Sequence, residues 1–454
     1  MKKENDLGRD EIGALVWRTA LPSMLAQFVS VLYSIVDRMY IGHIAGAGET
    51  ALAGVGVCGP VVTMVGSAAV WISWGASPLM GIRMGEGRPE EARRILRTGF
   101  CMLLAFSLAM MALVIPLREP MLRFFGASDA TYPYADAYFT VYLTGTVFAL
   151  LAAGLNQMII AQGFAAQAMR LVVLGAALNI ALDPVFIFAL GMGVRGAALA
   201  TILSQGLSCV WVLRFLTGKR TLLRLRRENF FIPARLLLPC ISLGLATFVM
   251  QASESVISVC FNSSLLKYGD DIAVGAMTIL SSVMQFAMLP LQGIAQGAQP
   301  ITSYNYGARN TQRVRKTFRL LLKVCLCYSV ALWAVIQLCP GAFARIFTPN
   351  VALVAFTVPA LRIYCGALFL FGIQIACQMT FVSIGAAGCS IIVAVLRKFV
   401  LLLPLIYLMP RLLADQTMAV YTAEPVADAI AVTCTAILFA VQFRKALRKL
   451  DAED

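Results

Sequence analysis

Carboxylate and amide side chains lie inside apolar runs of this chain, where a charge is costly. The run "LNIALDPVFIF" (178–188) holds Asn179 and Asp183, which are four residues apart and so share one face of a helix. A second carboxylate, Asp37, stands near the end of the run "PSMLAQFVSVLYSIVDRMYIG" (22–42). Two such acids brought together exchange a proton readily, and their oxygens also suit a hard cation such as Na⁺. Pro184 removes a backbone hydrogen bond directly after Asp183, so we expect a hinge there.

The composition places these acids in a membrane. The chain of 454 residues is 60% hydrophobic and 13% charged, with a mean hydropathy of +0.81. Soluble domains have about a quarter of their residues charged. Apolar runs of about 20 residues, long enough to cross a bilayer as helices, recur along the whole chain. We predict an all-α membrane protein with twelve transmembrane helices.

Basic residues indicate the orientation. Most of the 37 Lys and Arg residues fall in alternate segments, such as "GKRTLLRLRREN" and "GARNTQRVRKTFR". By the positive-inside rule, both termini are cytoplasmic and the protein is a multi-pass protein of the cell membrane. The net charge of +14 is then a record of topology, and nucleic acid is not a predicted partner. Among the basic residues, we expect only Arg362 in the interior of a span.

The two halves of the chain repeat each other. The segments "GASPLMGIRMG" (75–85) and "GAQPITSYNYG" (297–307) share Gly, Ala, Pro and Gly in the same order and spacing. Each shared residue is separated from its partner by the same number of residues as Gly75 from Gly297, a separation that we call the repeat offset. This repeat offset also pairs Gly163 with Gly385. Six spans per half give a parallel repeat, which is typical of transporters with two six-helix lobes. We predict an N-terminal lobe over 1–218, a basic cytoplasmic linker over 219–235 and a C-terminal lobe over 236–454.

Polar and Met side chains at helical spacing predict a wet cavity for a substrate. Glu254 stands among them in "LATFVMQASESVISVCFN" (245–262), and polar groups inside spans are functional by default. Methionines in apolar runs more often pack in the core or face lipid than contact a ligand. The glutamines, in contrast, suit a cavity lined by uncharged hydrogen-bond donors and acceptors. The predicted cavity residues are Gln27, Ser34, Gln251, Glu254, Ser258, Met284, Gln285, Met288, Gln292, Gln374 and Gln378.

Motifs for chemistry and for nucleotide binding are missing from the sequence. There is no GxxxxGK[ST], HExxH or GxSxG motif, and the twelve cysteines show no pairing or metal-ligand pattern. We therefore expect neither an enzyme nor a bound cofactor. Transport would then be driven by an ion gradient, with H⁺ or Na⁺ as the coupling ion, or it would run downhill.

Three stretches give the chain a resemblance to a known family. They are "SIVDRMYIG" with "ALAGVG", "LNIALDPVFIF" followed by "GVRGAALATILSQ", and "GAQPITSYNYGARNTQRVRKTF". Together they resemble the multidrug and toxic compound extrusion (MATE) family, bacterial type, whose members are ion-coupled antiporters of twelve helices in two lobes. The resemblance implies an ion site in the N-terminal lobe, formed here by Asp37, Asn179, Asp183 and Thr201. Some branches of the family use acids in spans seven and ten, and only Glu254 fits that pattern here.

The function predicted from these features is cation-coupled antiport by alternating access. The cavity offers carboxylates and, by this interpretation, almost no cation, so organic cations or other amphipathic drugs and toxic compounds are the expected cargo. The alternative is a flippase for lipid-linked sugars or other lipids of the same superfamily, which needs a cationic cavity. Small molecules and the bilayer are the expected partners, and we expect a monomer.

Overall fold

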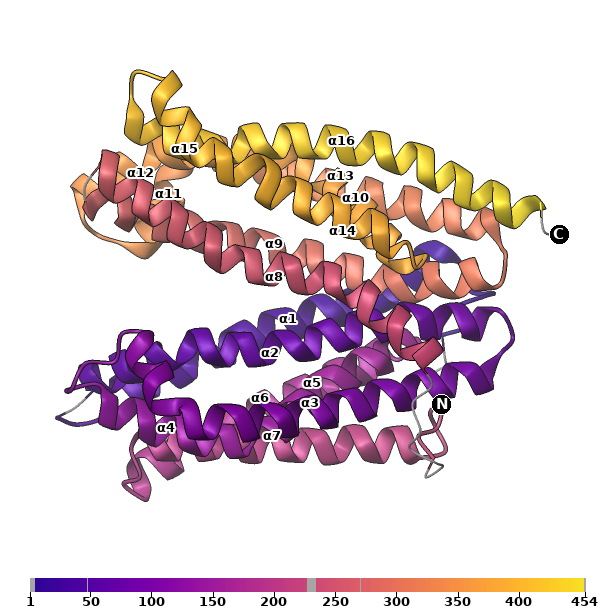
Figure 1. Ribbon diagram of the computed structural model, residues 1–454, viewed down its shortest axis with the longest axis horizontal. Coiled ribbons are helices and arrows are strands. Elements are labelled where there is room, and N and C mark those ends of the chain that lie inside the picture. Colours follow the sequence, from indigo (N-terminus) through magenta and orange to yellow (C-terminus); the bar gives the residue numbers. More distant parts are fainter. Residues whose placement is uncertain (1–4, 47, 227–233, 270, 453–454) are drawn as a thin grey trace. The chain divides into compact units, whose positions relative to one another are not determined.

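Helices account for the regular structure of the chain. The computed structural model describes residues 5–46, 48–226, 234–269 and 271–452, and it contains no strand within these ranges (Figure 1). Part of the predicted linker, residues 227–233, lies outside the described residues. The helices of the first half are α1 (Ile12–Gly42), α2 (Gly48–Gly85), α3 (Pro89–Phe124), α4 (Tyr132–Thr144), α5 (Thr146–Ala161), α6 (Ala165–Pro184), the π-helix η1 (Val185–Ala189) and α7 (Val194–Thr217).

The second half follows a similar order, with α11, η2 and α15 as additional elements. Its helices are α8 (Ala234–Tyr268), α9 (Asp271–Gly307), α10 (Thr311–Leu338), α11 (Pro340–Phe347), α12 (Val351–Tyr364), the 3₁₀ turn η2 (Leu368–Leu370), α13 (Phe371–Ser383), α14 (Ala387–Val395), the π-helix η3 (Leu396–Leu402), α15 (Leu403–Leu412) and α16 (Gln416–Ala452).

Local sequence explains where several helices begin. Pro89 occupies the first turn of α3, where its missing N–H is not needed. The side chain of Asn310 accepts a hydrogen bond from the N–H of Arg313 at the start of α10. Asn350 caps α12 in the same way, since it accepts from the N–H groups of two residues in its first turn.

The helices are long and apolar enough to cross a membrane. Within the described ranges, ten such helices are single or continuous, and two further spans are bent pairs, α4 with α5 at 57° and α12 with the segment Leu368–Ser383 at 41°. Counted in this way, the described chain supplies twelve spans, six in each half. The predicted all-α membrane fold is confirmed.

The internal repeat is visible in the helix boundaries. The starts of α1, α3, α6 and α7 precede those of α8, α10, α14 and α16 by the repeat offset in every case. Gly163 and Gly385, the pair noted in the sequence, both have a positive φ, 90° and 76°, in the turns that follow α5 and α13. Only glycine takes that conformation without strain. The repeat therefore extends from the sequence to individual backbone angles.

The chain divides into two compact units. The first turns of α1 belong to the second unit, and the first turns of α8 belong to the first unit. The first unit contains residues 5, 6 and 21–244, and the second contains residues 7–20 and 245–454. Repeat-related glycines mark the exchange. A Cβ at Gly75 of α2 would lie 1.9 Å from the carbonyl oxygen of Cys240 in α8, and one at Gly297 of α9 would lie 2.4 Å from the nitrogen of Ala20 in α1. The boundary between the two units, at residues 244 and 245, lies inside α8. The lobe boundary predicted from the sequence lies in the segment 219–235 and stays a prediction.

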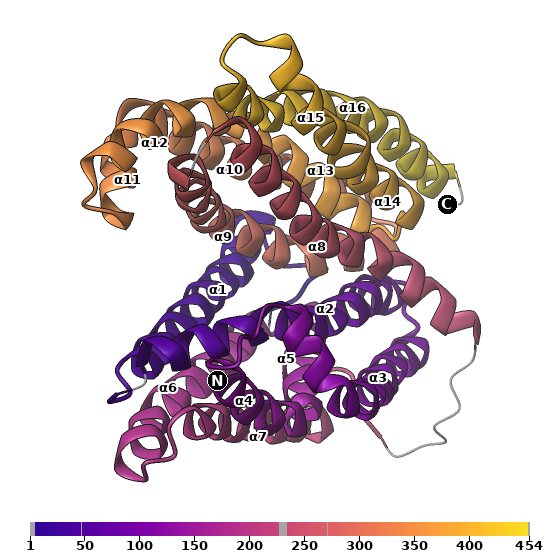
Figure 2. The same cartoon turned by 60° about the vertical axis from the view of Figure 1, so that its left-hand side comes forward.

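Within the first unit, α5 is the central helix. It contacts α2, α3, α6 and α7 (Figure 2). The contact is close because α5 presents Gly154, where a Cβ would meet the side chain of Leu103 at 2.5 Å. In the second unit α13 takes the same place, in contact with α9, α10, α14 and α16. These packed helices hold α6 and α7, and α14 to α16, in fixed positions for the polar groups described next.

Candidate functional site

The two carboxylates predicted to form a pair lie together in the first unit. Asp37 comes from α1, and Asp183 comes from the end of α6, immediately before Pro184. Their carboxyl groups are close enough to share a hydrogen bond. Asp183 is completely buried, and Asp37 is half-buried. Two acid groups in this arrangement have the chemistry to hold a proton or a cation between them.

An amide and a hydroxyl complete this site. The Nδ2 of Asn179 donates to Oδ1 of Asp183 at 3.3 Å and to Oγ1 of Thr201 at 3.4 Å. The Thr201 hydroxyl in turn donates to the carbonyl of Ala197 at 3.0 Å. The structure thus brings together Asp37, Asn179, Asp183 and Thr201 from three helices.

Three oxygen atoms at this site have no hydrogen-bond partner among the described residues. They are Asp37 Oδ1, Asn179 Oδ1 and Asp183 Oδ2, and all three are buried. A buried polar atom without a partner is costly, so three at one place indicate a site for a ligand. Oxygen-only ligands suit Na⁺, and the carboxylate pair suits a proton. The structure shows no group of three or more His, Cys, Asp or Glu side chains that could hold a metal ion in its described ranges.

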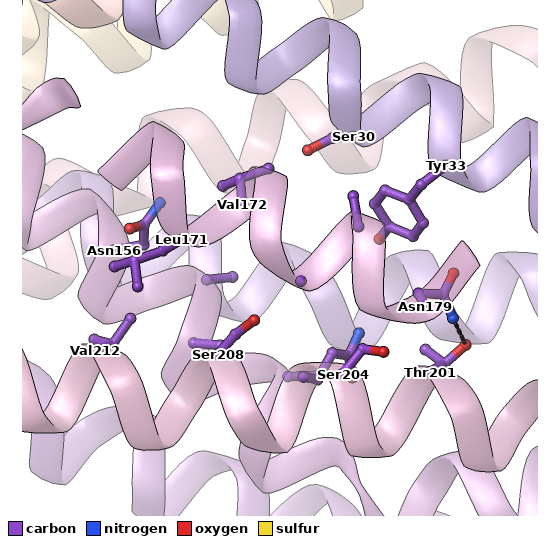
Figure 3. A pocket seen from close by; sticks show the side chains of 16 residues that line it. Ser30, Tyr33, Asn156, Leu171, Val172, Asn179, Thr201, Ser204, Ser208 and Val212 are labelled. Carbon is purple, nitrogen blue, oxygen red and sulfur yellow. Dashed lines mark hydrogen bonds between the residues drawn. The ribbon is translucent and has the colours of Figure 1, made fainter. Parts of the chain in front are cut away.

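A cavity that contains several polar side chains extends from this site and is lined by α1, α5, α6 and α7. Its volume is about 160 Å³, which is room for several water molecules. Asn179 and Thr201 line one end and Asn156 lines the other, with Ser204 and Ser208 between them (Figure 3). The remaining lining residues are Ser30, Tyr33, Ala149, Ala152, Ala153, Leu171, Val172, Gly175, Ala176, Gln205 and Val212.

Pro184 marks a change of helix type. The α-helix α6 ends at Pro184 and continues as the π-helix η1, in which the N–H of Leu190 bonds to the carbonyl of Val185 at 2.9 Å. π-Helical segments occur frequently at functional sites. The helix α7 packs closely on this segment, since a Cβ at Gly196 would lie 2.7 Å from the backbone of Phe186. The role of Pro184 as a hinge stays a prediction.

Comparison with known proteins agrees with this arrangement. The family model MatE matches residues 22–185 and 246–408, which together cover most of both repeats. The chain belongs to the MatE family. The family suggested by the three sequence motifs is thereby confirmed.

Relatives and solved structures of MatE proteins extend the match to almost the whole chain. A "FAD transporter" of Shewanella oneidensis is 24% identical over 370 residues, 77% of each chain. The "Multidrug export protein MepA" of Staphylococcus aureus is 21% identical over 394 residues, 87% of this chain and 86% of that protein. A crystal structure of "MATE in complex with MaD3S" has 25% identity and a TM-score of 0.90, and covers 98% of this chain and all of the other.

The family establishes the general activity of the chain. It is a multi-pass membrane protein and a transporter of small molecules, and it is not an enzyme. The orientation of the termini and the oligomeric state stay predictions.

The second unit differs from the prediction at Glu254. We expected this carboxylate to face a cavity that offers almost no cation. Instead, Oε1 of Glu254 lies 2.8 Å from Nζ of Lys398 in η3. The Glu254 side chain is 61% exposed, whereas that of Lys398 is only 5% exposed. A lysine held below the surface therefore neutralises the accessible acid.

A second buried cation lies beside this pair. Arg397 bonds through Nε to Oδ1 of Asp428 at 2.6 Å and through Nη2 to Oε1 of Glu424 at 3.2 Å. Both acids belong to α16, and all three residues are buried. The expectation that Arg362 is the only basic residue inside a span is wrong, because Arg397 and Lys398 lie within the span Ala387–Leu412.

Sequence reasoning missed this group because its members are adjacent to apparent span ends. In the sequence, the basic pair Arg397 and Lys398 satisfies the pattern of a span end next to a cytoplasmic segment. The available signal was the spacing in "YTAEPVADAI" (421–430), where Glu424 and Asp428 are four residues apart in an apolar run. This is the same i, i+4 pattern that singled out Asn179 and Asp183.

The other predicted cavity residues differ in their exposure. Gln374 and Gln378 are buried, and Gln378 donates to Oγ of Ser390 at 2.7 Å, which joins α13 to α14. Gln27 and Ser34 are half-buried in the first unit, and Met284 and Met288 are half-buried in the second. A single cavity lined by all of them stays a prediction. The exposed members are Gln251, Ser258, Gln285 and Gln292 of the second unit.

Proposed function

We propose that this protein is a cation-coupled antiporter that exports organic cations and other amphipathic drugs by alternating access. The observation that carries the proposal is the contact between Asp37 and Asp183, where both acids and Asn179 have an oxygen without a hydrogen-bond partner among the described residues. In this proposal the coupling ion, H⁺ or Na⁺, occupies that site. No bound cofactor is required, because the ion gradient supplies the energy.

Coupling follows from the geometry of the site. Asp37 belongs to α1 and Asp183 to α6, so the pair stays together only while these two helices keep their present distance. A bound proton or Na⁺ removes the repulsion between the acids and favours the closed pair. Loss of the ion favours a state in which they separate. The ion thus selects between conformations, which is the requirement for coupling. Pro184 and the π-helix η1 give α6 a place to bend.

Cationic cargo is supported by the acids and by the relatives. Glu254 exposes its carboxylate in the second unit, close to the exposed Gln251 and Ser258 of the same helix. Relatives named multidrug export proteins cover more than three quarters of the chain. A carboxylate beside apolar and thioether surfaces suits flat organic cations.

The experiment that tests this proposal measures export of ethidium, a flat organic cation, from vesicles that contain the purified protein. The H⁺ gradient and the Na⁺ gradient are imposed separately. We expect one of them to drive export in the wild type and neither to do so in Asp183→Asn. Asp129→Asn is a matched control, because this acid is exposed and pairs with Arg123 at the surface. Export that ignores both gradients would refute the coupling mechanism.

An anionic cargo is a second candidate. It is favoured by the relative named FAD transporter and by the two basic residues in the interior of the second unit. Both basic residues are paired with carboxylates, however, and these outnumber them three to two, so we rank this candidate lower. A lipid flippase ranks lower for the same reason. The same vesicles loaded with FAD distinguish the candidates, since export of FAD in preference to ethidium would replace the cationic proposal.

A further inference from the structure

The ion pair between Glu254 and Lys398 joins an accessible group to a buried one. Glu254 exposes more than half of its side chain on α8, whereas Lys398 is enclosed in η3. A cation that reaches Glu254 therefore competes with Lys398 for the same carboxylate. When Lys398 loses this partner, its ammonium needs another, because a buried charge without a partner is strongly unfavourable.

Arg397 and Lys398 are adjacent but differ in mobility. The guanidinium of Arg397 bonds to two carboxylates of α16 and lies 4.6 Å above the ring of Phe371. These contacts fix it from both sides. In the described structure, Lys398 forms its salt bridge with Glu254. The lysine side chain is a flexible chain of four carbons, so its ammonium group can move. Lys398 is thus the member of the group that can change position.

A second acceptor for Lys398 is present in the same group. Glu424 uses Oε1 for Arg397, while its Oε2 is buried without a hydrogen-bond partner among the described residues. Glu424 is only 3% exposed, and Lys398 lies within electrostatic reach of it. The other titratable groups that face this carboxylate are Asp428 of α16, Arg397, and Tyr364 and Cys365 at the end of α12.

The repeat shows that these charges are specific to the second unit. At the repeat offset, Arg397 and Lys398 correspond to Gly175 and Ala176. These two small residues line the cavity of the first unit. Where the first unit has a cavity, the second unit places two cations.

We propose that Lys398 is a tethered counter-ion with two positions, at Glu254 when the transporter is empty and at Oε2 of Glu424 when a cationic substrate occupies Glu254. This inference rests on the proposed export of organic cations and assigns a specificity role to Lys398 and Glu424. The lysine weakens binding of the cargo and displaces it again, while Glu424 makes that exchange possible. Glu254 is the residue that contacts the substrate, and Lys398 and Glu424 act through it.

Binding of ethidium to the purified protein tests the proposal through the sign of each effect. Lys398→Met removes the competitor and should lower the Kd by about three- to tenfold, the range for a partly exposed charge pair. Glu424→Gln keeps an oxygen for Arg397 but removes the second position of Lys398, so the Kd should rise by a similar factor. In the Lys398→Met background, Glu424→Gln should change the Kd no further. Binding of Nile red, a neutral dye, should stay unchanged. The matched control is Lys267→Met, since Lys267 is exposed at the end of α8.

A thermal unfolding cycle tests the two positions without any substrate. Glu254→Gln alone should lower the Tm only slightly, because Lys398 turns to Glu424. Glu254→Gln combined with Glu424→Gln leaves the ammonium buried without either acceptor, so the loss in Tm should exceed the sum of the single losses.

The two experiments separate the failure of this inference from failure of the proposed function. If the wild type does not bind ethidium, the cationic cargo is refuted and the unfolding cycle alone decides on the two positions. Additive losses in Tm overturn the inference. Weaker ethidium binding in both Lys398→Met and Glu424→Gln also overturns it, because a purely structural network predicts the same sign for both.

Discussion

Replacement of Arg397 by Met should destabilise the second unit strongly. Arg397 connects η3 to α16 through two carboxylates at 2.6 and 3.2 Å, and each of the three side chains is at most 11% exposed. Methionine fills a similar volume but leaves Glu424 and Asp428 buried without their cation. The variant therefore tests whether this ion network is required for folding.

The magnitude follows from the burial of the network. Removal of one partner from a buried ion pair costs about 3–5 kcal/mol, because the other charge stays buried without compensation. The stacked contact with Phe371 adds about 1 kcal/mol. For a unit of this size, 1 kcal/mol corresponds to roughly 2–4 °C in Tm. We expect the Tm of Arg397→Met to fall by roughly 8–24 °C.

The assay is thermal unfolding of the purified protein in detergent, followed by the fraction that stays monodisperse after heating. A triple variant, Arg397→Met with Glu424→Gln and Asp428→Asn, is the decisive comparison. It removes all three charges, so it should recover most of the lost stability. Arg123→Met is the control, since Arg123 pairs with a surface acid, Asp129, that is 97% exposed. A loss of only a degree or two in Arg397→Met, or no recovery in the triple variant, would refute the reasoning.

Three further predictions concern the first unit and the topology. Asp37→Asn and Asp183→Asn should each abolish ion-driven export, while the purified variants bind ethidium as the wild type does; wild-type export rates in either would make that residue structural. Gly196→Ala should lower coupled export several-fold, because its Cβ would press on the backbone of Phe186 in η1 at 2.7 Å and shift the helix that carries the threonine of the ion site; unchanged export would show that this contact is tolerant. Single cysteines at Arg224 and Gln312, in an otherwise cysteine-free background, should react with an impermeant thiol reagent only from the cytoplasmic side, and labelling of both from outside intact cells would contradict the predicted orientation.

The fold and the first carboxylate pair were predictable because their signals are local or periodic. Long apolar runs predict spans whatever their neighbours are, and the repeat offset needs only a comparison of the chain with itself. Asp37 and Asp183 stood out because each is an acid in an apolar run, and the resemblance to the MATE family added Thr201 to the site.

The ion pairs of the second unit were not predictable in the same way. Lys398 and Glu254 belong to helices that are far apart in the sequence, and no periodicity connects them. A basic pair such as Arg397 and Lys398 also satisfies the pattern of a span end, so the charge rule assigns it to the cytoplasmic side. Only the packing of η3 between α14 and α15, in contact with α16, places these side chains in the interior.

The two halves share a backbone plan but treat charge in opposite ways. In the first unit, Asp37 and Asp183 lie together, and within the described part of the chain each has an oxygen without a hydrogen-bond partner. In the proposed mechanism, an ion from solution balances their charge. In the second unit, Lys398 stands at the position that corresponds to Ala176 and balances Glu254 from within the chain. An ion from solution binds and dissociates, so its occupancy follows the ion gradient. The ammonium of Lys398 stays with the protein, and in our proposal it leaves Glu254 only when another cation binds there. We therefore propose that energy coupling belongs to the first unit and recognition of a cationic cargo to the second, although both share the same repeated fold.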